Sequence, residues 1–328
     1  MLNKSRDVLY CGCNIDKIKQ AKPVLDSDLL DLYVSYQKER TNIYYKKEVL
    51  KQKPPYTDQS YLRDYRFTNT RRELDKESKI LIENVLNKDI SNKNKLMNSI
   101  FCRSFYSKAY PLNLLEQKYI DFENINNSDY YNYLLKTLPE SSSRVYLCSG
   151  FIRGCRWELE KDKIEFKNSL DAVLKQLHRY TDHYYESFWD IESPIELMKK
   201  IKNLGNFLKY QVFVDMTYLP EYPFSENEFV LSGPGCTIGI NLLVQDLDGL
   251  TPEEFMFWFR DNISILRPDF NPEEMFFFLE PEDRNWGVMQ IENSFCEFQK
   301  VLKVYGKDKP TGKIIKRKTE MFNENDWA

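Results

Sequence analysis

Apolar residues recur at helical intervals along most of the chain, and the central example runs from Ile195 to Met216. Successive apolar positions there lie three or four residues apart, which is the period of an amphipathic helix, and Gly205-Asn206 interrupts them halfway. The positions are Leu197, Ile201, Leu204, Leu208, Val212 and Met216. The pattern predicts two short helices joined by a glycine turn. Such a hairpin can hold a phosphate on its free amides, or it can be an ordinary corner between helices.

Helical periodicity also predicts the elements on either side of this hairpin. A long amphipathic helix is expected over residues 25–51, with Asp26 or Ser27 as its N-cap and Pro54-Pro55 as its stop. Further helices are expected over the second half of 61–87, over 92–110, in a Tyr-rich stretch that ends near 138, and over 167–189, 252–266, 272–279 and 285–305. Residues 145–156 are apolar and broken by glycine, which fits a strand or a buried helix. The expected fold class is mainly α.

The polar loop at residues 140–143 is the expected border between two lobes. It separates an N-terminal helical part, residues 1–140, from a helical part that contains the hairpin, residues 141–305. Residues 306–328 are rich in lysine and lack periodicity, which predicts a mobile tail.

Charge is distributed unevenly along the 328 residues, although the net charge is only −3. Residues 1–120 carry 23 Lys and Arg against 15 Asp and Glu, whereas residues 121–328 carry 24 against 35. A basic N-terminal part suits a polyanionic partner, and the alternative is a solvated charged surface. The 22 Tyr and 21 Phe offer many rings for packing or for stacking on bases.

Several classes of protein are disfavoured by the sequence. No apolar run approaches the ~20 residues that span a bilayer, and the first residues have no signal-peptide pattern, so we expect a cytoplasmic protein that does not enter a membrane. The seven cysteines form no CxxC pair, and His178 and His183 are spaced too poorly to chelate a metal, so we expect free thiols and no metal. The absence of a P-loop motif argues against a kinase and against a nucleotide cofactor.

A basic segment between Tyr65 and Asp75 carries the first candidate chemistry. Four arginines at positions 63, 66, 71 and 72 surround Phe67-Thr68-Asn69. Arginine forks suit phosphate oxygens, and an asparagine amide can read the edge of a base. The structural alternative is that the arginines pair with Asp64, Glu73 and Asp75 on a helix surface.

Three segments, which are residues 65–75, the hairpin with the following residues 229–240, and residues 291–301, together resemble the α-glutamyl/putrescinyl thymine pyrophosphorylase family and the related helical domain of hydroxymethyluracil DNA kinases. Within that family the resemblance points to phage-defence DNA glycosylases that act on glucosylated hydroxymethylcytosine. The matching positions are Arg66, Thr68, Asn69, Arg72, Asp75, Gly205, Asp215, Gly233, Pro234, Gly235, Asn293, Cys296, Glu297 and Lys300. Each segment is weak alone, but they occur in the expected order over most of the chain.

The resemblance implies a fold similar to the helix-hairpin-helix DNA glycosylases, with two lobes and a cleft between them. The implied activity is excision of a bulky modified pyrimidine from double-stranded phage DNA that carries hypermodified bases, which leaves an abasic site. A second hypothesis is a transferase that displaces pyrophosphate from activated hydroxymethyluracil to install an amine or amino acid. A third is a DNA-binding module without catalysis.

The resemblance also suggests the residues of the site. Asp215 and Glu297 are the expected catalytic carboxylates, because a glycosylase needs a carboxylate near the sugar on which positive charge develops. The expected pocket for the base or its adduct contains Tyr65, Arg66, Asn69, Arg72, Glu292 and Asn293. The expected contacts to the DNA backbone come from Lys202, Gly205, Asn206, Gly233 and Gly235. Lysines near the hairpin suit phosphate contacts, so we expect a monofunctional enzyme.

Each candidate has a structural alternative. Repair glycosylases carry their catalytic aspartate at a position where this chain has Val230-Leu231-Ser232-Gly233, so another carboxylate must replace it: Asp215, Glu292 or Glu297. Asp215 could instead orient a neighbouring helix, and Glu297 could pair with Arg66 or Arg72. The glycines of the Gly-Pro-Gly element could approach DNA closely or simply make a tight turn.

Overall fold

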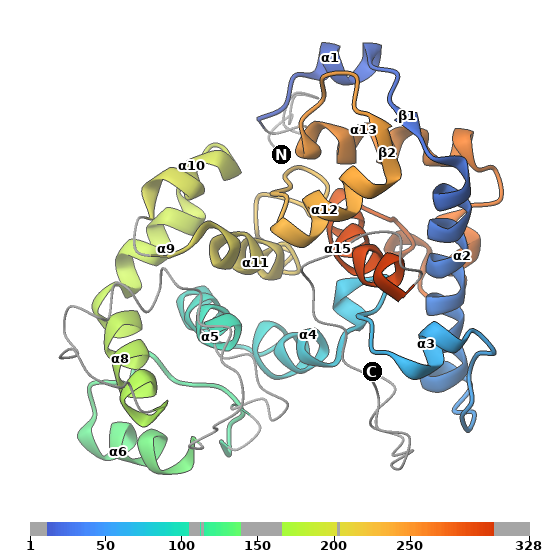
Figure 1. Cartoon of the computed structure of the whole chain (residues 1–328). Coiled ribbons are helices and arrows are strands. Elements are labelled where there is room, and N and C mark those ends of the chain that lie inside the picture. Colours follow the sequence, from blue (N-terminus) through green and yellow to red (C-terminus); the bar gives the residue numbers. More distant parts are fainter. Residues whose placement is uncertain (1–11, 105–111, 113–114, 139–165, 202–203, 305–328) are drawn as a thin grey trace. The chain divides into compact units, whose positions relative to one another are not determined.

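The computed structural model describes residues 12–104, 112, 115–138, 166–201 and 204–304 (Figure 1). The chain forms two compact units. The first combines both ends of the sequence, residues 1–76 and 226–328, and the second is residues 77–225. The border that we expected at 140–141 lies outside the described residues, as do the expected tail and residues 145–156. The grouping differs from the expected ranges because the last helices join the N-terminal segment.

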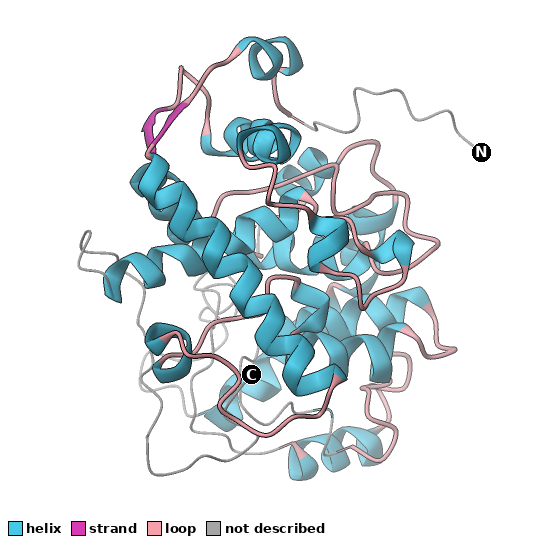
Figure 2. Cartoon of the chain, turned by 90° about the vertical axis from the view of Figure 1, so that its right-hand side faces the viewer, coloured by secondary structure: helices cyan, strands magenta, loops and turns pink. Residues whose placement is uncertain are grey.

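The described residues are mainly helical, which confirms the expected fold class (Figure 2). In the first unit the elements are α1 (Ile15–Gln20), β1 (Val24–Leu25), α2 (Ser27–Tyr44), α3 (Ser60–Asp64), α12 (Pro234–Leu243), β2 (Val244–Asp246), α13 (Pro252–Leu266), α14 (Pro272–Met275) and α15 (Val288–Val304). In the second unit they are α5 (Asn92–Ser104), α6 (Ser128–Thr137), α8 (Phe166–Arg179), α9 (Thr181–Trp189), α10 (Pro194–Lys200) and α11 (Asn206–Met216), and α4 (Lys76–Leu81) begins at the border.

Capping explains why several helices begin where the sequence predicted. The Asp26 side chain accepts a hydrogen bond from the Leu29 amide at 3.0 Å and starts α2. Thr251 and Glu254 form a capping box at the start of α13, which has Pro252 in its first turn. Two differences were not predicted: the 167–189 segment is two helices separated at Tyr180, and α14 stops at Met275.

Among the described residues the sheet is one short antiparallel pair, in which β1 lies beside β2 and Val24 is opposite Asp246. It joins the start of α2 to the end of α12, since the Asp26 amide donates to the Leu243 carbonyl at 2.9 Å. No strand was predicted there because two-residue and three-residue strands leave no periodicity to detect.

The core of the first unit lies where α15 packs against α12 and against α2. Rings of Tyr33, Phe259, Phe295 and Phe298 meet edge-to-face or stacked, with centroids 4.9–5.5 Å apart. The Gly-Pro-Gly element, which is expected to make a tight turn or to approach DNA, lies at the start of α12, and Gly233 is the N-cap of that helix.

Two glycines of α12 allow its close contact with α15. A Cβ added at Gly239 would lie 2.2 Å from the Phe295 carbonyl oxygen, and one at Gly235 would lie 2.7 Å from the Cys296 sulfur. Replacing Gly239 with alanine is therefore expected to lower the free energy of unfolding by about 2 kcal/mol, because the backbone oxygen cannot move aside. Gly235→Ala should cost less, and adding Cys296→Ala should relieve it. Urea unfolding followed by circular dichroism measures all three variants, and an unchanged midpoint for Gly239→Ala would contradict the packing argument.

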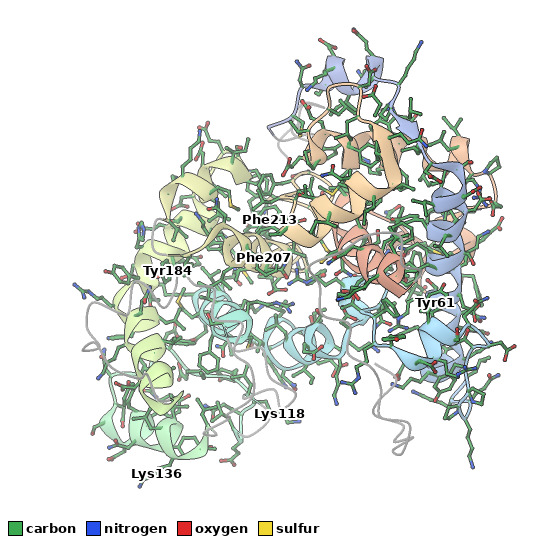
Figure 3. The ribbon with its side chains drawn as sticks, viewed as in Figure 1. Tyr61, Lys118, Lys136, Tyr184, Phe207 and Phe213 are labelled. Carbon is green, nitrogen blue, oxygen red and sulfur yellow. The ribbon has the colours of Figure 1, made fainter. Side chains whose placement is uncertain are left out.

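The second unit is built around α5, which contacts α8, α9 and α11. Its inward residues Leu96, Met97, Ile100 and Phe101 are fully buried. Tyr184 of α9 and Phe213 of α11 are also fully buried, whereas Phe207 at the start of α11 is 52% exposed (Figure 3). The predicted helical hairpin is confirmed as α10 and α11. Its likeness to the DNA-glycosylase hairpin stays a prediction.

Candidate active site

The candidate site of the first unit is assembled on α15 and on the loop of residues 67–72. Side chains of α2 hold this loop by its backbone. Arg40 donates from Nε to the Thr68 carbonyl at 3.0 Å and from Nη2 to the Phe67 carbonyl at 3.3 Å. One residue further along α2, the Thr41 hydroxyl meets the Thr70 hydroxyl at 2.8 Å. The predicted basic segment is therefore an ordered loop whose carbonyls are fixed by a buried arginine.

A stripe on α15 contacts the same loop from the other side. Gln290, Asn293 and Glu297 follow one another at three-residue and four-residue spacing and so share one face of the helix. The Arg72 amide donates to Gln290 Oε1 at 2.8 Å, and the Thr68 amide donates to Glu297 Oε2 at 3.2 Å. Asn293 Nδ2 donates to Thr68 Oγ1 at 3.3 Å and to the Asn69 carbonyl at 3.2 Å. The structure thus brings Asn69 together with Asn293 and Glu297, which lie more than 200 residues further along the sequence.

Glu297 is almost fully buried and forms an ion pair with Lys300, one turn further along α15. The pairing of Glu297 with Arg66 or Arg72, which was the expected structural alternative, stays a prediction. Burial also affects Arg40 nearby: the pKa of its guanidinium is lowered by desolvation, which the neighbouring Tyr36, Asp75 and Glu297 partly offset. A carboxylate and two cations therefore share this interior region.

Asn69 uses part of its side chain to shape the loop. Its backbone amide donates to Asp75 at 2.7 Å, and Nδ2 donates to the Leu74 carbonyl at 2.8 Å. Its Oδ1 atom is buried and has no hydrogen-bond partner in the part of the chain that the structure describes. Buried amide oxygens are nearly always paired, so this acceptor is available to a ligand.

Glu292 lies on a different face of α15, which is turned toward α12. Its Oε1 accepts a hydrogen bond from the Gly233 amide at 3.2 Å, at the positive end of α12. The pKa of Glu292 is raised to about 7, and burial is the main cause. The hydrogen bond from the Gly233 amide and the charge of Arg72 lower this pKa, whereas the charge of Glu297 raises it. The adjacent Ser232 amide donates a hydrogen bond to Glu253 Oε1 at 2.9 Å. Two carboxylates therefore already use the N-terminus of α12.

This finding bears on the predicted DNA contacts of Gly233 and Gly235. The Gly233 amide is engaged by Glu292, and Gly235 is the point where α12 meets Cys296. Both glycines therefore have a structural reason to be present, and their contact with DNA stays a prediction.

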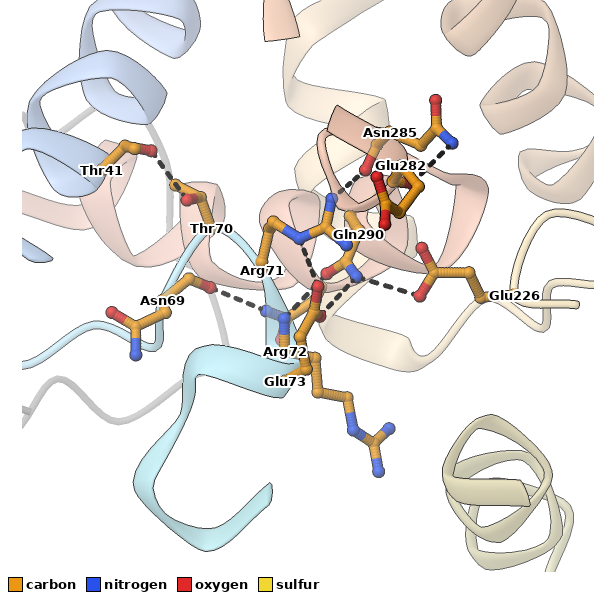
Figure 4. A network of polar contacts seen from close by, with 11 residues as sticks. Thr41, Asn69, Thr70, Arg71, Arg72, Glu73, Glu226, Glu282, Asn285 and Gln290 are labelled. Atoms are coloured by element: carbon orange, nitrogen blue, oxygen red, sulfur yellow. Dashed lines mark hydrogen bonds and ion pairs between the residues drawn. The ribbon is translucent and has the colours of Figure 1, made fainter. Parts of the chain in front are cut away.

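A second acid pair lies beside the loop, and sequence reasoning missed it. Gln290 Nε2 donates to Glu73 at 2.9 Å and to Glu226 at 3.1 Å, so one amide joins two carboxyl groups (Figure 4). Desolvation, and then the charge of Glu73, raise the pKa of Glu226 to about 8. The Arg71 guanidinium contacts Glu73 and the Asn285 carbonyl, which supports the structural alternative for that arginine.

The other residues of the predicted base pocket are placed as follows. Tyr65 and Arg66 are half-buried at the end of α3, and Arg72 is buried. Arg63 pairs with Asp64 at 3.3 Å. Of the residues that sequence reasoning missed, Gln290 shares the stripe of Asn293 and Glu297, so helical spacing alone could have found it. Nothing in the sequence pointed to Arg40 or Glu226, because their partners are distant along the chain.

Asp215 belongs to the second unit, where its carboxylate is fully buried. Arg103 of α5 donates to it through Nε at 2.8 Å and through Nη2 at 2.6 Å, and the same Nη2 reaches Ser78 at 3.2 Å. A two-pronged buried pair of this kind supports the structural alternative, in which Asp215 fixes α11 to α5. Its catalytic role stays a prediction.

The hairpin itself is stabilised by a buried lysine. Lys209 of α11 donates to the Met198 carbonyl at 2.6 Å and to the Ile201 carbonyl at 2.9 Å, at the end of α10. Gly205 is the N-cap of α11, and Asn206 is exposed, as a backbone-binding turn would require. Lys202 lies outside the described residues. The phosphate contacts expected of this turn stay predictions.

The described residues contain neither a metal-binding cluster nor a membrane-spanning helix. No group of three or more His, Cys, Asp and Glu side chains gathers there in a way that could hold a metal ion. None of the helices in the described ranges has the length and apolar composition needed to cross a membrane.

Comparison with known proteins places this arrangement in a family. Residues 27–309 match the family described as "5-hmdU DNA kinase, helical domain". The 5-hmdU DNA kinase of Bacillus phage SP10 is 24% identical over a 342-residue alignment, which covers 97% of this chain and 53% of the phage protein. The chain thus spans about half the length of that relative. No solved structure matches. The resemblance to this helical domain, inferred above from three segments, is confirmed: the chain belongs to the family of the 5-hmdU DNA kinase helical domain.

Proposed function

We propose that this protein is a DNA glycosylase that excises a bulky modified pyrimidine, such as glucosylated hydroxymethylcytosine, from double-stranded phage DNA in anti-phage defence. The observation that carries the proposal is that α15 holds two buried carboxyl groups, Glu292 and Glu297, and that the loop which Glu297 contacts carries the buried Asn69 Oδ1, which has no partner among the described residues. Membership of a family named for an enzyme that acts on a modified pyrimidine of DNA supports the same class of substrate.

The proposed reaction breaks the bond between the anomeric carbon and the base nitrogen after the nucleotide is flipped out. Positive charge develops on the sugar, and the Glu297 carboxylate, which pairs with Lys300, stabilises it or accepts a proton from the attacking water. The bonding electrons leave with the base, which takes up a proton. Glu292, whose pKa is about 7, is suited to supply that proton near neutral pH. The products are a free base and an abasic site.

The remaining predicted residues have supporting roles in this proposal. The side-chain oxygen of Asn69 and the side-chain amide of Asn293 pair with the base or its adduct, and the Tyr65 ring stacks on it. Arg66 and Arg72 hold a phosphate or the sugar adduct. The hairpin residues Lys202, Gly205 and Asn206, with Gly233 and Gly235, contact the DNA backbone. Asp215 would take the catalytic role only by giving up its pairing with Arg103.

A second candidate is favoured by the name of the phage relative. A 5-hmdU kinase produces a phosphorylated hydroxymethyl group. Once a second phosphorylation has made the diphosphate ester, a transferase could displace its pyrophosphate with an amine or amino acid. The same cluster would then bind the activated base, and the leaving group would be pyrophosphate. A DNA-binding module without catalysis would use only the backbone contacts.

The test is incubation of the purified full-length protein with phage DNA that carries glucosylated hydroxymethylcytosine, beside unmodified DNA. We expect release of the modified base, detected by mass spectrometry, and abasic sites without strand breaks, detected with an aldehyde probe. Glu297→Gln should slow release about tenfold or more, whereas the exposed control Glu273→Gln should not. Amine-dependent loss of pyrophosphate from activated hydroxymethyluracil DNA, without base release, would assign the transferase activity instead. If neither free base nor pyrophosphate is released, the DNA-binding module without catalysis is the remaining function.

A further inference from the structure

Gln37 of α2 is the most unusual polar residue of the first unit. Its side chain has no exposed surface, and neither Nε2 nor Oε1 has a hydrogen-bond partner among the residues that the structure describes. A buried amide without partners is strongly unfavourable, since it has lost water and gained nothing in exchange. Such a group in a folded protein calls for an explanation, and a bound polar ligand is one.

The position of Gln37 along α2 shows what it faces. Tyr33, Gln37 and Thr41 are spaced four residues apart and so form one stripe of the helix. At one end of the stripe, Tyr33 contacts Ser294, Phe295 and Phe298 of α15. At the other end, Thr41 contacts Thr70 of the loop (Figure 4). Gln37 therefore lies between α15 and the loop of residues 67–70.

That is also where the candidate site is assembled. Asn293 and Glu297 join α15 to Thr68 and Asn69, and Arg40, three residues after Gln37, donates to the Thr68 carbonyl. The position of Gln37 on α2, between Tyr33 and Thr41, directs its amide toward this interior, which holds the Glu297 carboxylate and the Asn69 oxygen that lacks a partner among the described residues. Gln37 is the one residue of this interior, within the described part of the chain, whose donor and acceptor are both unused.

We propose that the Gln37 amide reads the hydrogen-bonding edge of the flipped pyrimidine. This inference rests on the proposed function and names a residue that determines its substrate class. A pyrimidine presents a donor and an acceptor side by side at N3 and C4, and a glutamine amide offers the complementary pair. Because Gln37 is covered in the unbound protein, the base reaches it when the loop of residues 67–70 shifts from α15.

Gln37→Leu separates reading of the base from a structural role. Removing an unpaired buried amide is expected to raise the melting temperature of the free protein, because leucine fills the site without a desolvated polar group. Ser99→Ala in α5 is the matched control, since Ser99 Oγ is likewise buried without a partner among the described residues, but lies in the second unit. Gln37→Met is a second variant of similar length should leucine pack poorly.

The binding measurement uses two duplex oligonucleotides, one with a single glucosylated hydroxymethylcytosine and one with a tetrahydrofuran abasic analogue at the same place. Gln37→Leu is expected to lower affinity for the first by about 10- to 100-fold and to leave affinity for the second unchanged. Ser99→Ala should change neither. Equal affinity of Gln37→Leu and wild type for the base-containing duplex would overturn the inference, and a bound water would then explain the amide.

Base release by the same variants separates this inference from the proposed function. If wild type releases base and Gln37→Leu releases it equally well, the role of Gln37 is refuted while the glycosylase stands. If wild type releases no base, the glycosylase is refuted. The two duplexes still decide whether Gln37 contacts the pyrimidine.

Discussion

Replacing Asp215 with asparagine is expected to lower the free energy of unfolding by about 3 to 5 kcal/mol, the usual effect of removing one partner from a buried ion pair. Asp215 is fully buried, and the Arg103 side chain that donates two hydrogen bonds to it is only 10% exposed. The substitution leaves the guanidinium charged in a region from which water is largely excluded. Urea unfolding of the full-length chain, followed by circular dichroism, measures the loss.

The double variant Arg103→Met, Asp215→Asn distinguishes structure from catalysis. Removing both charges should restore most of the stability lost in Asp215→Asn, because neither partner is then left unpaired. If Asp215 only fixes α11 to α5, the double variant should also release base at nearly the wild-type rate. A stable double variant without activity would instead return Asp215 to the active site. A loss below about 1 kcal/mol in Asp215→Asn would show that the ion pair contributes little.

The sequence was sufficient for elements that local signals determine. α13 begins and ends where Pro252 and the apolar period predicted, because its capping box and its first-turn proline are local features. The hairpin was likewise visible, since Gly205 interrupts a strong helical period. The break at Tyr180 was missed because neither glycine nor proline marks it.

Tertiary contacts decided what periodicity could not. The sequence did not show that Gly235 and Gly239 admit Cys296 and the Phe295 backbone of α15, a helix some 50 residues further along. The candidate site shows the same limit. Asn69, Asn293 and Glu297 were predicted from resemblance, whereas the support of their loop on α2, Arg40, could be found only once the loop and both helices were placed together.

Stability should depend on pH through Glu292, and the direction follows from its raised pKa. The pKa of this carboxyl is about 7 in the folded protein and near the ordinary 4.5 when unfolded. Below pH 4.5 both states hold the proton. Between pH 4.5 and 7 the folded state keeps it and the unfolded state loses it, so the free energy of unfolding falls as pH rises, by about 3 kcal/mol in total. Above pH 7 the loss is complete.

Glu292→Gln removes this titration and keeps an oxygen that can accept from the Gly233 amide. The variant should match wild type near pH 4.5 and exceed it by about 2 to 3 kcal/mol above pH 7.5. Glu226→Gln offers a comparison, because the pKa of Glu226 is about 8 and its effect should extend about one pH unit higher. The exposed Glu273→Gln is the control without such an effect. Urea titrations at half-unit steps from pH 4.5 to 8.5 give the curves.

Glu292→Gln also tests why the protein contains a buried carboxyl group with so high a pKa. Residues that destabilise the fold at neutral pH are often kept at active sites. Glu292→Gln should therefore be more stable than wild type at pH 7.5 and yet release base more slowly, because glutamine cannot supply a proton to the leaving pyrimidine. In wild type, release should decline as pH rises through 7. A variant that is both more stable and fully active would remove Glu292 from the chemistry and leave Glu297 to act alone.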